Sequence, residues 1–221
     1  EYMAALLTSV LDSTAKVAEY ISECREMGIK VLPPDVNESD ARFTVVGGNI
    51  RFGLVAIKNI GERFIELLMQ ERRENGPFTG FEEFCRRMSG KELNRRAVES
   101  LIKAGAFDSL GCRRKALMQM TDDVLECIAS DGRHNIEGQL DLFGLGDEGE
   151  ADSGSASVPV PDVEEYSRRE LMDMERETTG LYLSGHPMDD YRPYLRNTHV
   201  VHIGSLMEED NGFQDDQIIS V

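Results

Sequence analysis

Apolar side chains recur at helical spacing at the start of the chain. The residues that predict a first helix, over positions 3–11, stand at i, i+4 and i+7: Met3, Leu7 and Val10. A second helix follows, capped by Asp12 or Ser13 and ending at Gly28. The next segment, at 31–35, is extended, because its two consecutive prolines exclude a helix. The start of the chain is therefore predicted to be a helical pair that leads into a strand.

A glycine-rich turn predicts a β-hairpin, and a block of helices follows it. Two short β-forming runs, 43–46 and 50–52, flank Gly47-Gly48-Asn49. After a short apolar turn at 53–57, helices are predicted at residues 62–74, around 79–88, at 93–103 and at 112–129. The predicted fold class is therefore mainly α with a small β-hairpin. Because Trp is absent and aromatic residues are only 7%, we do not expect a single large core.

The composition changes after the helical block. Gly, Ser, Asp, Glu and Pro dominate residues 144–163, which are too poor in large apolar side chains to offset the entropy of ordering, so a disordered acidic linker is predicted. A charged helix is predicted at 164–178 and strand-like runs at 198–203 and 217–221. The chain begins inside a helical pattern and stops inside the last run, so we expect a piece of a longer protein. No apolar run approaches the ~18 residues of a transmembrane helix.

The acidic total conceals a basic block. Lys and Arg number 24 and Asp and Glu 41, so the formal net charge is −17, which on average repels nucleic-acid phosphate. Residues 51–120, however, carry 14 basic and 9 acidic side chains, between two net-acidic flanks. This asymmetry predicts a local anion-binding surface, although a solvated face of cations is the alternative. The four cysteines form no C-x-x-C pair and are expected to be reduced thiols.

Residues 57–65, the first corner, have the pattern of a helix-hairpin-helix motif: a short helix, a tight turn with glycine between apolar residues, and a second helix. Gly61 is expected to let the backbone turn sharply and approach a phosphate with no Cβ in the way. Unpaired amides at the start of the next helix then favour an anion. The candidate DNA contacts here are Lys58, Asn59, Ile60, Gly61 and Arg63.

Residues 101–115, the second corner, repeat this pattern later in the chain. Two such units joined by a helix predict a tandem module that grips both strands of a duplex across the minor groove, through contacts that read no base. The alternative for either unit is an ordinary helix–glycine–helix corner that binds no ligand. The candidate contacts at the second corner are Lys103, Gly105, Ala106, Arg113, Arg114 and Lys115.

Residues 139–143, Gln-Leu-Asp-Leu-Phe, resemble the peptide with which bacterial replication proteins bind the sliding clamp. In that interpretation a flexible peptide lays its anchors into a preformed groove. Leu142 and Phe143 would fill an apolar pocket, Leu140 would add contact, Gln139 would hydrogen-bond at the groove edge, and Asp141 would face outward. The alternative is that the three apolar side chains pack on their own domain.

Several other patterns do not predict chemistry. Residues 144–149 fit G-x-G-x-x-G but open an acidic linker rather than a helix, and their charge would repel pyrophosphate. His199 and His202 have no convincing partner ligands, and the three adjacent Asp pairs diverge on a strand or a helix. No triad or P-loop is present. The sequence therefore predicts no catalytic residue and no metal or cofactor site in this segment.

Taken together, several stretches resemble the bacterial DNA polymerase III alpha subunits, the C-family replicative polymerases. They occur in the same order in this chain: residues 31–37, 50–54, 57–61, 101–110 (LIKAGAFDSL), 139–143 (QLDLF) and 179–187 (TGLYLSGHP). The resemblance covers essentially the whole chain. It is specific as a combination, even though each hairpin alone is not.

The resemblance implies a domain order. Residues 1–30 would end the fingers domain, and 31–138 would hold the last fingers elements and the tandem helix-hairpin-helix. The clamp-binding peptide at 139–143 and the linker at 144–163 would follow. Residues 164–221 would form a connecting helix and the truncated start of an OB-fold.

The resemblance also implies a function. The parent protein would be a cytoplasmic DNA-directed DNA polymerase that uses Mg²⁺ in a palm domain, which has no counterpart in these residues. The partners implied for this segment are double-stranded DNA, the sliding clamp and other replicase subunits, with no membrane. Two rival functions stay open: the DNA-binding module of a nuclease or repair enzyme, and an acidic interaction segment whose basic block binds the chain's own tail.

Overall fold

The structure is a computed structural model, and it describes residues 1–11, 13–137, 158–191 and 194, with the side chains of 132–137 excepted. The chain divides into two compact units, Glu1–Ser184 and Gly185–Val221. In the second unit the described part holds one short 3₁₀ helix, η3 (Pro187–Asp190), which His186 caps. All the elements below belong to the first unit.

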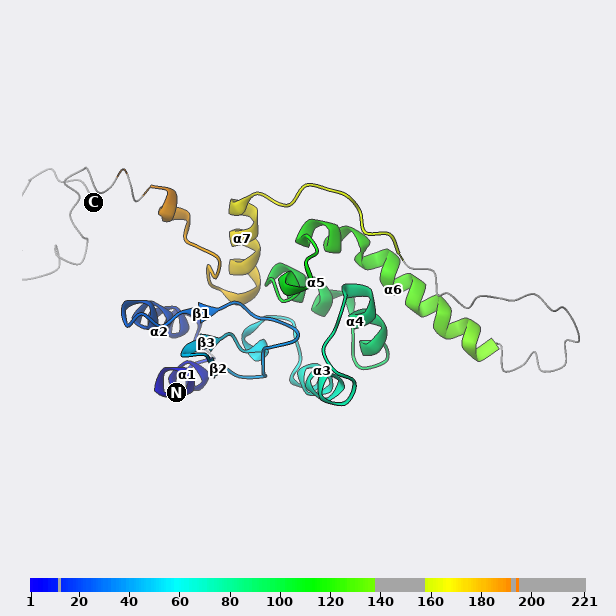
Figure 1. The fold of residues 1–221 in the computed structure, drawn as a ribbon, viewed down its shortest axis with the longest axis horizontal. Helices are drawn as coiled ribbons and strands as arrows, with labels where there is room; N and C mark the ends of the chain where they lie inside the picture. Colours follow the sequence, from blue (N-terminus) through cyan, green and yellow to red (C-terminus); the bar gives the residue numbers. More distant parts are fainter. Residues whose placement is uncertain (12, 138–157, 192–193, 195–221) are drawn as a thin grey trace, which may run out of the picture. The chain divides into compact units, whose positions relative to one another are not determined.

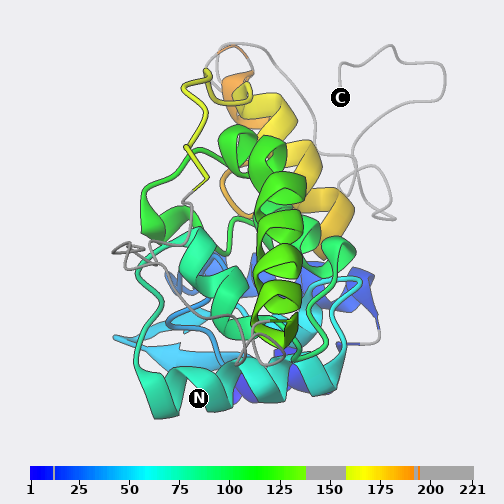
Figure 2. The ribbon, with the colours of Figure 1, turned by 90° about the vertical axis from the view of Figure 1, so that its right-hand side faces the viewer.

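The first unit is mainly helical and carries a small sheet (Figure 1), as the sequence predicts. Its helices are α1 (Tyr2–Ser9), α2 (Thr14–Glu26), α3 (Glu62–Asn75), α4 (Phe81–Met88), α5 (Arg95–Lys103), α6 (Arg114–Glu137) and α7 (Arg168–Thr179). Two 3₁₀ turns precede α3 and α6: η1 (Leu54–Ala56) and η2 (Asp108–Leu110). Figure 2 shows α3 and α7 at opposite sides of the unit.

The sheet has three short strands in the order β1-β3-β2. The strands are β1 (Val31–Leu32), β2 (Thr44–Val46) and β3 (Asn49–Arg51). The hairpin predicted around Gly47 and Gly48 is confirmed, since both glycines have positive φ and join β2 to the antiparallel β3. β1 pairs with β3 in parallel, an addition that the sequence pattern did not indicate.

Capping side chains explain where α2, α5 and α7 begin. Ser13 accepts a hydrogen bond from the Lys16 amide at the start of α2, and Asn94 accepts one from the Ala97 amide at the start of α5. The predicted helix at 164–178 begins later, because Ser167 and Glu170 form a capping box at the start of α7. α6 begins at Arg114 and runs to Glu137, beyond the predicted end at residue 129.

The expectation that no single large core forms is wrong. Buried apolar side chains make one contiguous cluster that reaches from α1 to Leu181. Its centre is aromatic: Phe84 meets Phe78 and Phe107 edge-to-face, with ring centroids 4.9 Å apart in both pairs. Phe81 also packs on Phe107. Four phenylalanine rings thus pack edge-to-face in a core that has no Trp.

A buried carboxylate fastens α3 to α4. Glu71 of α3 accepts a hydrogen bond from Asn75 and pairs with Arg87 of α4 at 3.0 Å and with Lys91 beyond it. The hydrogen bond from Lys91 outweighs the effect of burial and, with those from Arg87 and Asn75, lowers the pKa of Glu71 to about 2. Glu71 is therefore ionised at neutral pH although its side chain is buried. It compensates two cations of the basic block.

The stretch before α7 is more ordered than predicted. Residues 158–163 belong to the predicted linker, yet the structure describes them, outside any helix or strand. The Val158 amide donates to Glu82 of α4, and Val158 packs on the core cluster. Residues 144–157 of that predicted linker lie outside the described residues.

Candidate nucleic-acid interface

The first corner turns at Asn59 rather than at Gly61. Asn59 has φ 64°, whereas Gly61 has φ −77° and is the N-cap of α3. Asn tolerates this left-handed conformation better than other non-glycine residues. The Asn59 amide group also donates to Ser100 Oγ at 3.1 Å, which ties the corner to α5. The idea that Gly61 makes the sharp turn is therefore wrong.

Gly61 instead leaves the start of α3 open. No side chain caps this helix end, and a Cβ built on Gly61 would have nothing within 4 Å. The first amides of a helix lack partners within the helix and carry the positive end of its dipole. Because Gly61 has no Cβ, an anion can approach these amides closely. The space around Gly61 is therefore consistent with the predicted close approach of a phosphate to the backbone.

The charged residues of the first corner differ in availability. Arg63 has a side chain 64% exposed and, among the described residues, its ion pair is with Glu66 of the same helix, at 3.1 Å, a kind of surface pair worth little. Lys58 is held more firmly: its Nζ donates to the Glu177 carbonyl at 3.0 Å and its amide to the Thr178 carbonyl at 2.8 Å. Lys58 thus binds the end of α7, whereas Arg63, in its exposed pair with Glu66, can reach a ligand more readily.

The second corner faces the interior. Gly105 has φ 81°, and a Cβ there would lie 2.8 Å from Arg114 Cζ and 2.9 Å from Asp108 Oδ2. Ala106 is fully buried, and its carbonyl accepts a hydrogen bond from the Val36 amide at 2.9 Å. Gly105 and Ala106 therefore serve packing within the fold. Neither presents its backbone to an outside phosphate in this structure.

Arg114 is the centre of a buried ion cluster. It donates to Asp108 at 2.6 and 2.9 Å, to Glu175 of α7 at 3.2 Å, and to the Lys103 carbonyl. Burial favours a lower pKa for Arg114, but its hydrogen bonds and the nearby charges of Asp108 and Glu175 raise the pKa above its ordinary value. The Arg114 side chain is 7% exposed, so we withdraw it from the candidate DNA contacts.

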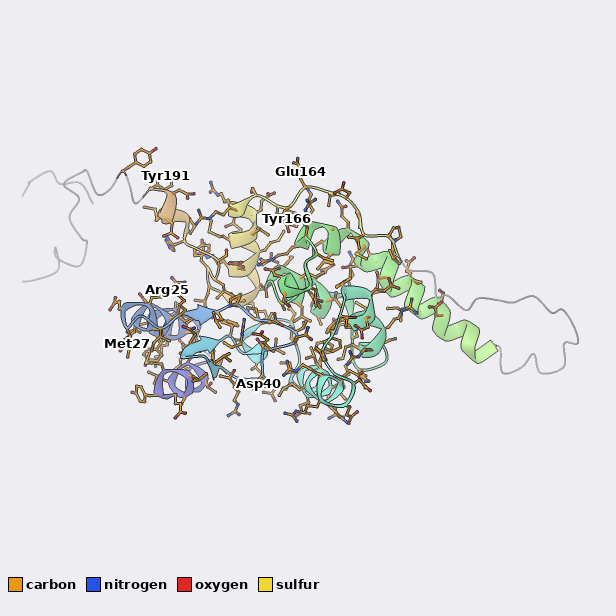
Figure 3. All side chains as sticks on the ribbon, viewed as in Figure 1. Arg25, Met27, Asp40, Glu164, Tyr166 and Tyr191 are labelled. Atoms are coloured by element: carbon orange, nitrogen blue, oxygen red, sulfur yellow. The ribbon has the colours of Figure 1, made fainter. Side chains whose placement is uncertain are left out.

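The other cations of the second corner meet residues near α7. Lys103 pairs with Glu177 at 2.9 Å, and Arg113 donates to the Val163 carbonyl at 2.7 Å and to Asp162 at 3.3 Å. The Lys115 ammonium lies 5.6 Å from the ring centroid of Tyr166, which Figure 3 labels on the segment before α7. The sequence left open that the basic block binds the chain's own acidic tail, but it did not indicate which residues would pair.

The start of α6 is capped by a carboxylate that is distant in sequence. Glu165 accepts the Arg114 amide on Oε2 at 2.7 Å and the Lys115 amide on Oε1 at 3.1 Å. The two corners are thus opposite in state: the start of α3 has no side-chain cap, whereas the start of α6 holds an anionic one.

The clamp-peptide residues, Gln139 to Phe143, lie outside the described residues, as do His199 and His202. Among the residues that the structure describes, no group of three His, Cys, Asp or Glu residues is placed to hold a metal ion. Among the described helices, none is both long enough and apolar enough to cross a bilayer.

Part of this chain matches a known sequence motif. A sequence model of the helix-hairpin-helix motif matches residues 28–117, a range that includes both corners. The described fold is therefore that of a helix-hairpin-helix module with a small sheet.

Relatives in sequence cover most of this chain. The chain is 44% identical over 190 residues to DNA polymerase III subunit alpha of Mycobacterium tuberculosis. The aligned region covers 86% of this chain and 16% of that relative. It is 40% identical over 222 residues to the subunit of Saccharopolyspora erythraea (99% and 18%) and 39% identical over 197 residues to that of Xylella fastidiosa (89% and 16%). The chain is thus a homologue of one segment of the DNA polymerase III alpha subunits, and spans about a sixth of their length.

The two glycines give a matched stability test. We expect Gly105→Ala to lower the free energy of unfolding by about 2 kcal/mol or more, because alanine is strained at positive φ and its Cβ overlaps the Arg114 cluster. Gly61→Ala should cause no such loss and should raise the free energy of unfolding by at most about 1 kcal/mol, since φ is ordinary and the space is empty. Urea unfolding followed by circular dichroism measures both. Equal losses would contradict the assignment of different roles to the two corners.

Proposed function

We propose that this chain is a duplex-DNA-binding and sliding-clamp-binding segment of a bacterial replicative DNA polymerase in the cytoplasm. One observation carries the DNA part: within a matched helix-hairpin-helix region, the start of α3 is uncapped and open beside the exposed Arg63. The relatives' shared name supports replication over repair as the setting.

The proposed contact is made mainly by backbone. A phosphate oxygen would accept hydrogen bonds from the first amides of α3, where the helix dipole favours negative charge. Arg63 would add a charge-assisted contact from the same turn. Such contacts fix the position of the sugar-phosphate backbone and carry no sequence information. This is the kind of grip that a polymerase needs on the duplex it has just made.

The overall negative charge of the chain limits how strongly the open start of α3 can bind DNA. A chain of net charge −17 repels DNA at long range, so a useful contact must be local and supported by a second tether. Glu62 and Glu66 lie in the same region of α3, which keeps the contact weak. We therefore infer that the first corner stabilises a complex whose other contacts lie elsewhere in the parent polymerase.

We propose that Gln139 to Phe143 supplies one such tether by binding the sliding clamp. The peptide begins two residues after the last residue of α6, and its sequence, QLDLF, combines three apolar anchors with an edge glutamine. The clamp encircles the same duplex that the first corner contacts. Two weak grips on one assembly can then exceed either alone by ~10²–10⁴ in avidity.

DNA synthesis itself is proposed for the parent protein, as are Mg²⁺ and the other replicase subunits. The donor set needed for the metal is not assembled by the described residues. We therefore assign no step of nucleotidyl transfer to this segment.

The rival interpretation, in which the basic block binds acidic residues of its own chain, is favoured by one set of contacts. At the second corner, Lys103 and Arg113 pair with Glu177 and Asp162. In the part of the chain that the structure describes, no carboxylate from another element pairs with Arg63 at the first corner. The two interpretations therefore apply to different corners.

A charge reversal at the first corner tests DNA binding. We expect Arg63→Glu to weaken binding of the full chain to a short duplex by about 1 kcal/mol, roughly fivefold, and to reduce the slope of log K against log[salt] by ~0.9. Fluorescence anisotropy over a salt series measures both quantities. The matched control is Arg73→Glu, an exposed arginine in the last turn of α3, which should leave the slope unchanged. Equal effects of the two variants would refute a specific contact at the start of α3.

A double alanine substitution tests the clamp peptide. Leu142→Ala with Phe143→Ala should abolish binding to immobilised sliding clamp in surface plasmon resonance, because both anchors lose their apolar contact. Asp141→Ala is the control and should bind the clamp like the unsubstituted chain, since this side chain faces outward in the proposed pose. If the double variant binds the clamp as tightly as the unsubstituted chain does, the peptide is ruled out as the docking site.

A further inference from the structure

The segment before α7 lies across the second corner. Residues 162–166, the capping segment, supply partners to three consecutive residues of the corner. The Arg113 guanidinium binds the Val163 carbonyl and Asp162, and the amides of Arg114 and Lys115 both bind the Glu165 carboxylate. Figure 3 labels Glu164 and Tyr166 on this segment.

The Glu165 carboxylate occupies the start of α6 as an external anion would. Its two oxygens accept two successive backbone amides at 2.7 and 3.1 Å, which is the arrangement that a phosphate receives at a helix N-terminus. The Tyr166 amide donates to the same carboxylate at 2.8 Å and fixes its orientation. The anion at this corner therefore comes from the chain itself.

The capping segment is held less firmly than the helix that follows it. Glu175 anchors α7 through buried Arg114 and also accepts the amides of Leu183 and Ser184, both at 2.9 Å. The Asp162 side chain, by contrast, is fully exposed in its pair with Arg113, which is a weak type of interaction. The ion pair of the segment is therefore open to solvent, whereas the ion pair that holds α7 is buried.

There is also room beside the carboxylate. An open hollow of about 250 Å³ lies at this place, and its lining includes Gly111, Arg113 and Glu165. A group of phosphate size can enter the hollow next to the Arg113 guanidinium. It would then meet the same amides that Glu165 now occupies.

We propose that the capping segment is an autoinhibitory contact: Glu165 competes with nucleic-acid phosphate for the start of α6. In the state described here the chain offers duplex DNA the first corner only. The second corner becomes available when DNA displaces residues 162–166, and Arg113 and Lys115 then gain a phosphate partner. This inference rests on the proposed DNA-binding function and adds a two-step engagement to it.

Removing one charge at the capping segment tests the competition. Glu165→Gln in the full chain should bind a duplex about three- to tenfold more tightly, with a salt slope steeper by ~0.9 for the added phosphate contact. Glu164→Gln is the matched control, because it removes the same charge from the exposed neighbouring residue. It should change the affinity less than twofold and leave the slope as it is.

A measurement on the unaltered chain covers the case in which Glu165→Gln unfolds. Hydrogen exchange followed by mass spectrometry should show faster exchange in peptides spanning 162–166 when saturating duplex is added, because the displaced segment is no longer held in one conformation and the local hydrogen bond from the Tyr166 amide to Glu165 opens more often. Peptides from α7 should exchange at an unchanged rate.

The outcomes separate this inference from the proposed function. If the chain binds duplex and Arg63→Glu weakens it, but Glu165→Gln behaves like Glu164→Gln and exchange in 162–166 is unchanged, the autoinhibitory contact is refuted alone. If neither the chain nor Glu165→Gln binds duplex at low salt, the proposed DNA binding fails and the competition fails with it.

Discussion

The second corner depends on Arg114, which is buried among Asp108, Glu175 and the Lys103 carbonyl. Leaving such a charge without partners costs about 3–5 kcal/mol, so α5, the corner and α7 are bound to one arrangement. Gly105 is required there because any Cβ would overlap the Arg114 guanidinium. With α7 fixed, the preceding segment is placed where Glu165 reaches the start of α6. One buried cation thus determines which corner is closed.

The contrast between the corners changes how the basic block functions. Several of its cations, including Lys58, Lys103 and Arg113, are engaged by carbonyls or carboxylates of the same chain. A count of basic side chains therefore overstates the surface available to DNA. What remains at the first corner is the backbone at the start of α3, with Arg63 beside it. A contact of this kind gains specificity for phosphate from helix geometry rather than from net charge.

Local features were predictable from the sequence, and partnerships between distant residues were not. Gly47 and Gly48 specify the hairpin through their own φ values, and the apolar spacing specifies α3 and α5, because both signals act within a few residues. Both corners of the helix-hairpin-helix pattern fall where expected. The turn at Asn59 was missed because glycine was taken as the only candidate for a sharp bend. Glu165 was missed because its two amide partners lie about fifty residues away, where composition indicates charge but not position.

The most direct test of the open first corner is a two-dimensional amide NMR spectrum of the ¹⁵N-labelled full chain, recorded while duplex DNA is added at low salt. The amide resonances of Glu62, Arg63 and Phe64, at the start of α3, are expected to shift together as the duplex binds. Those of the last turn of α3, near Arg73, should stay in place. Saturable binding of duplex with the Glu62–Phe64 amides unmoved would contradict the account, because the grip on DNA would then lie elsewhere in the chain.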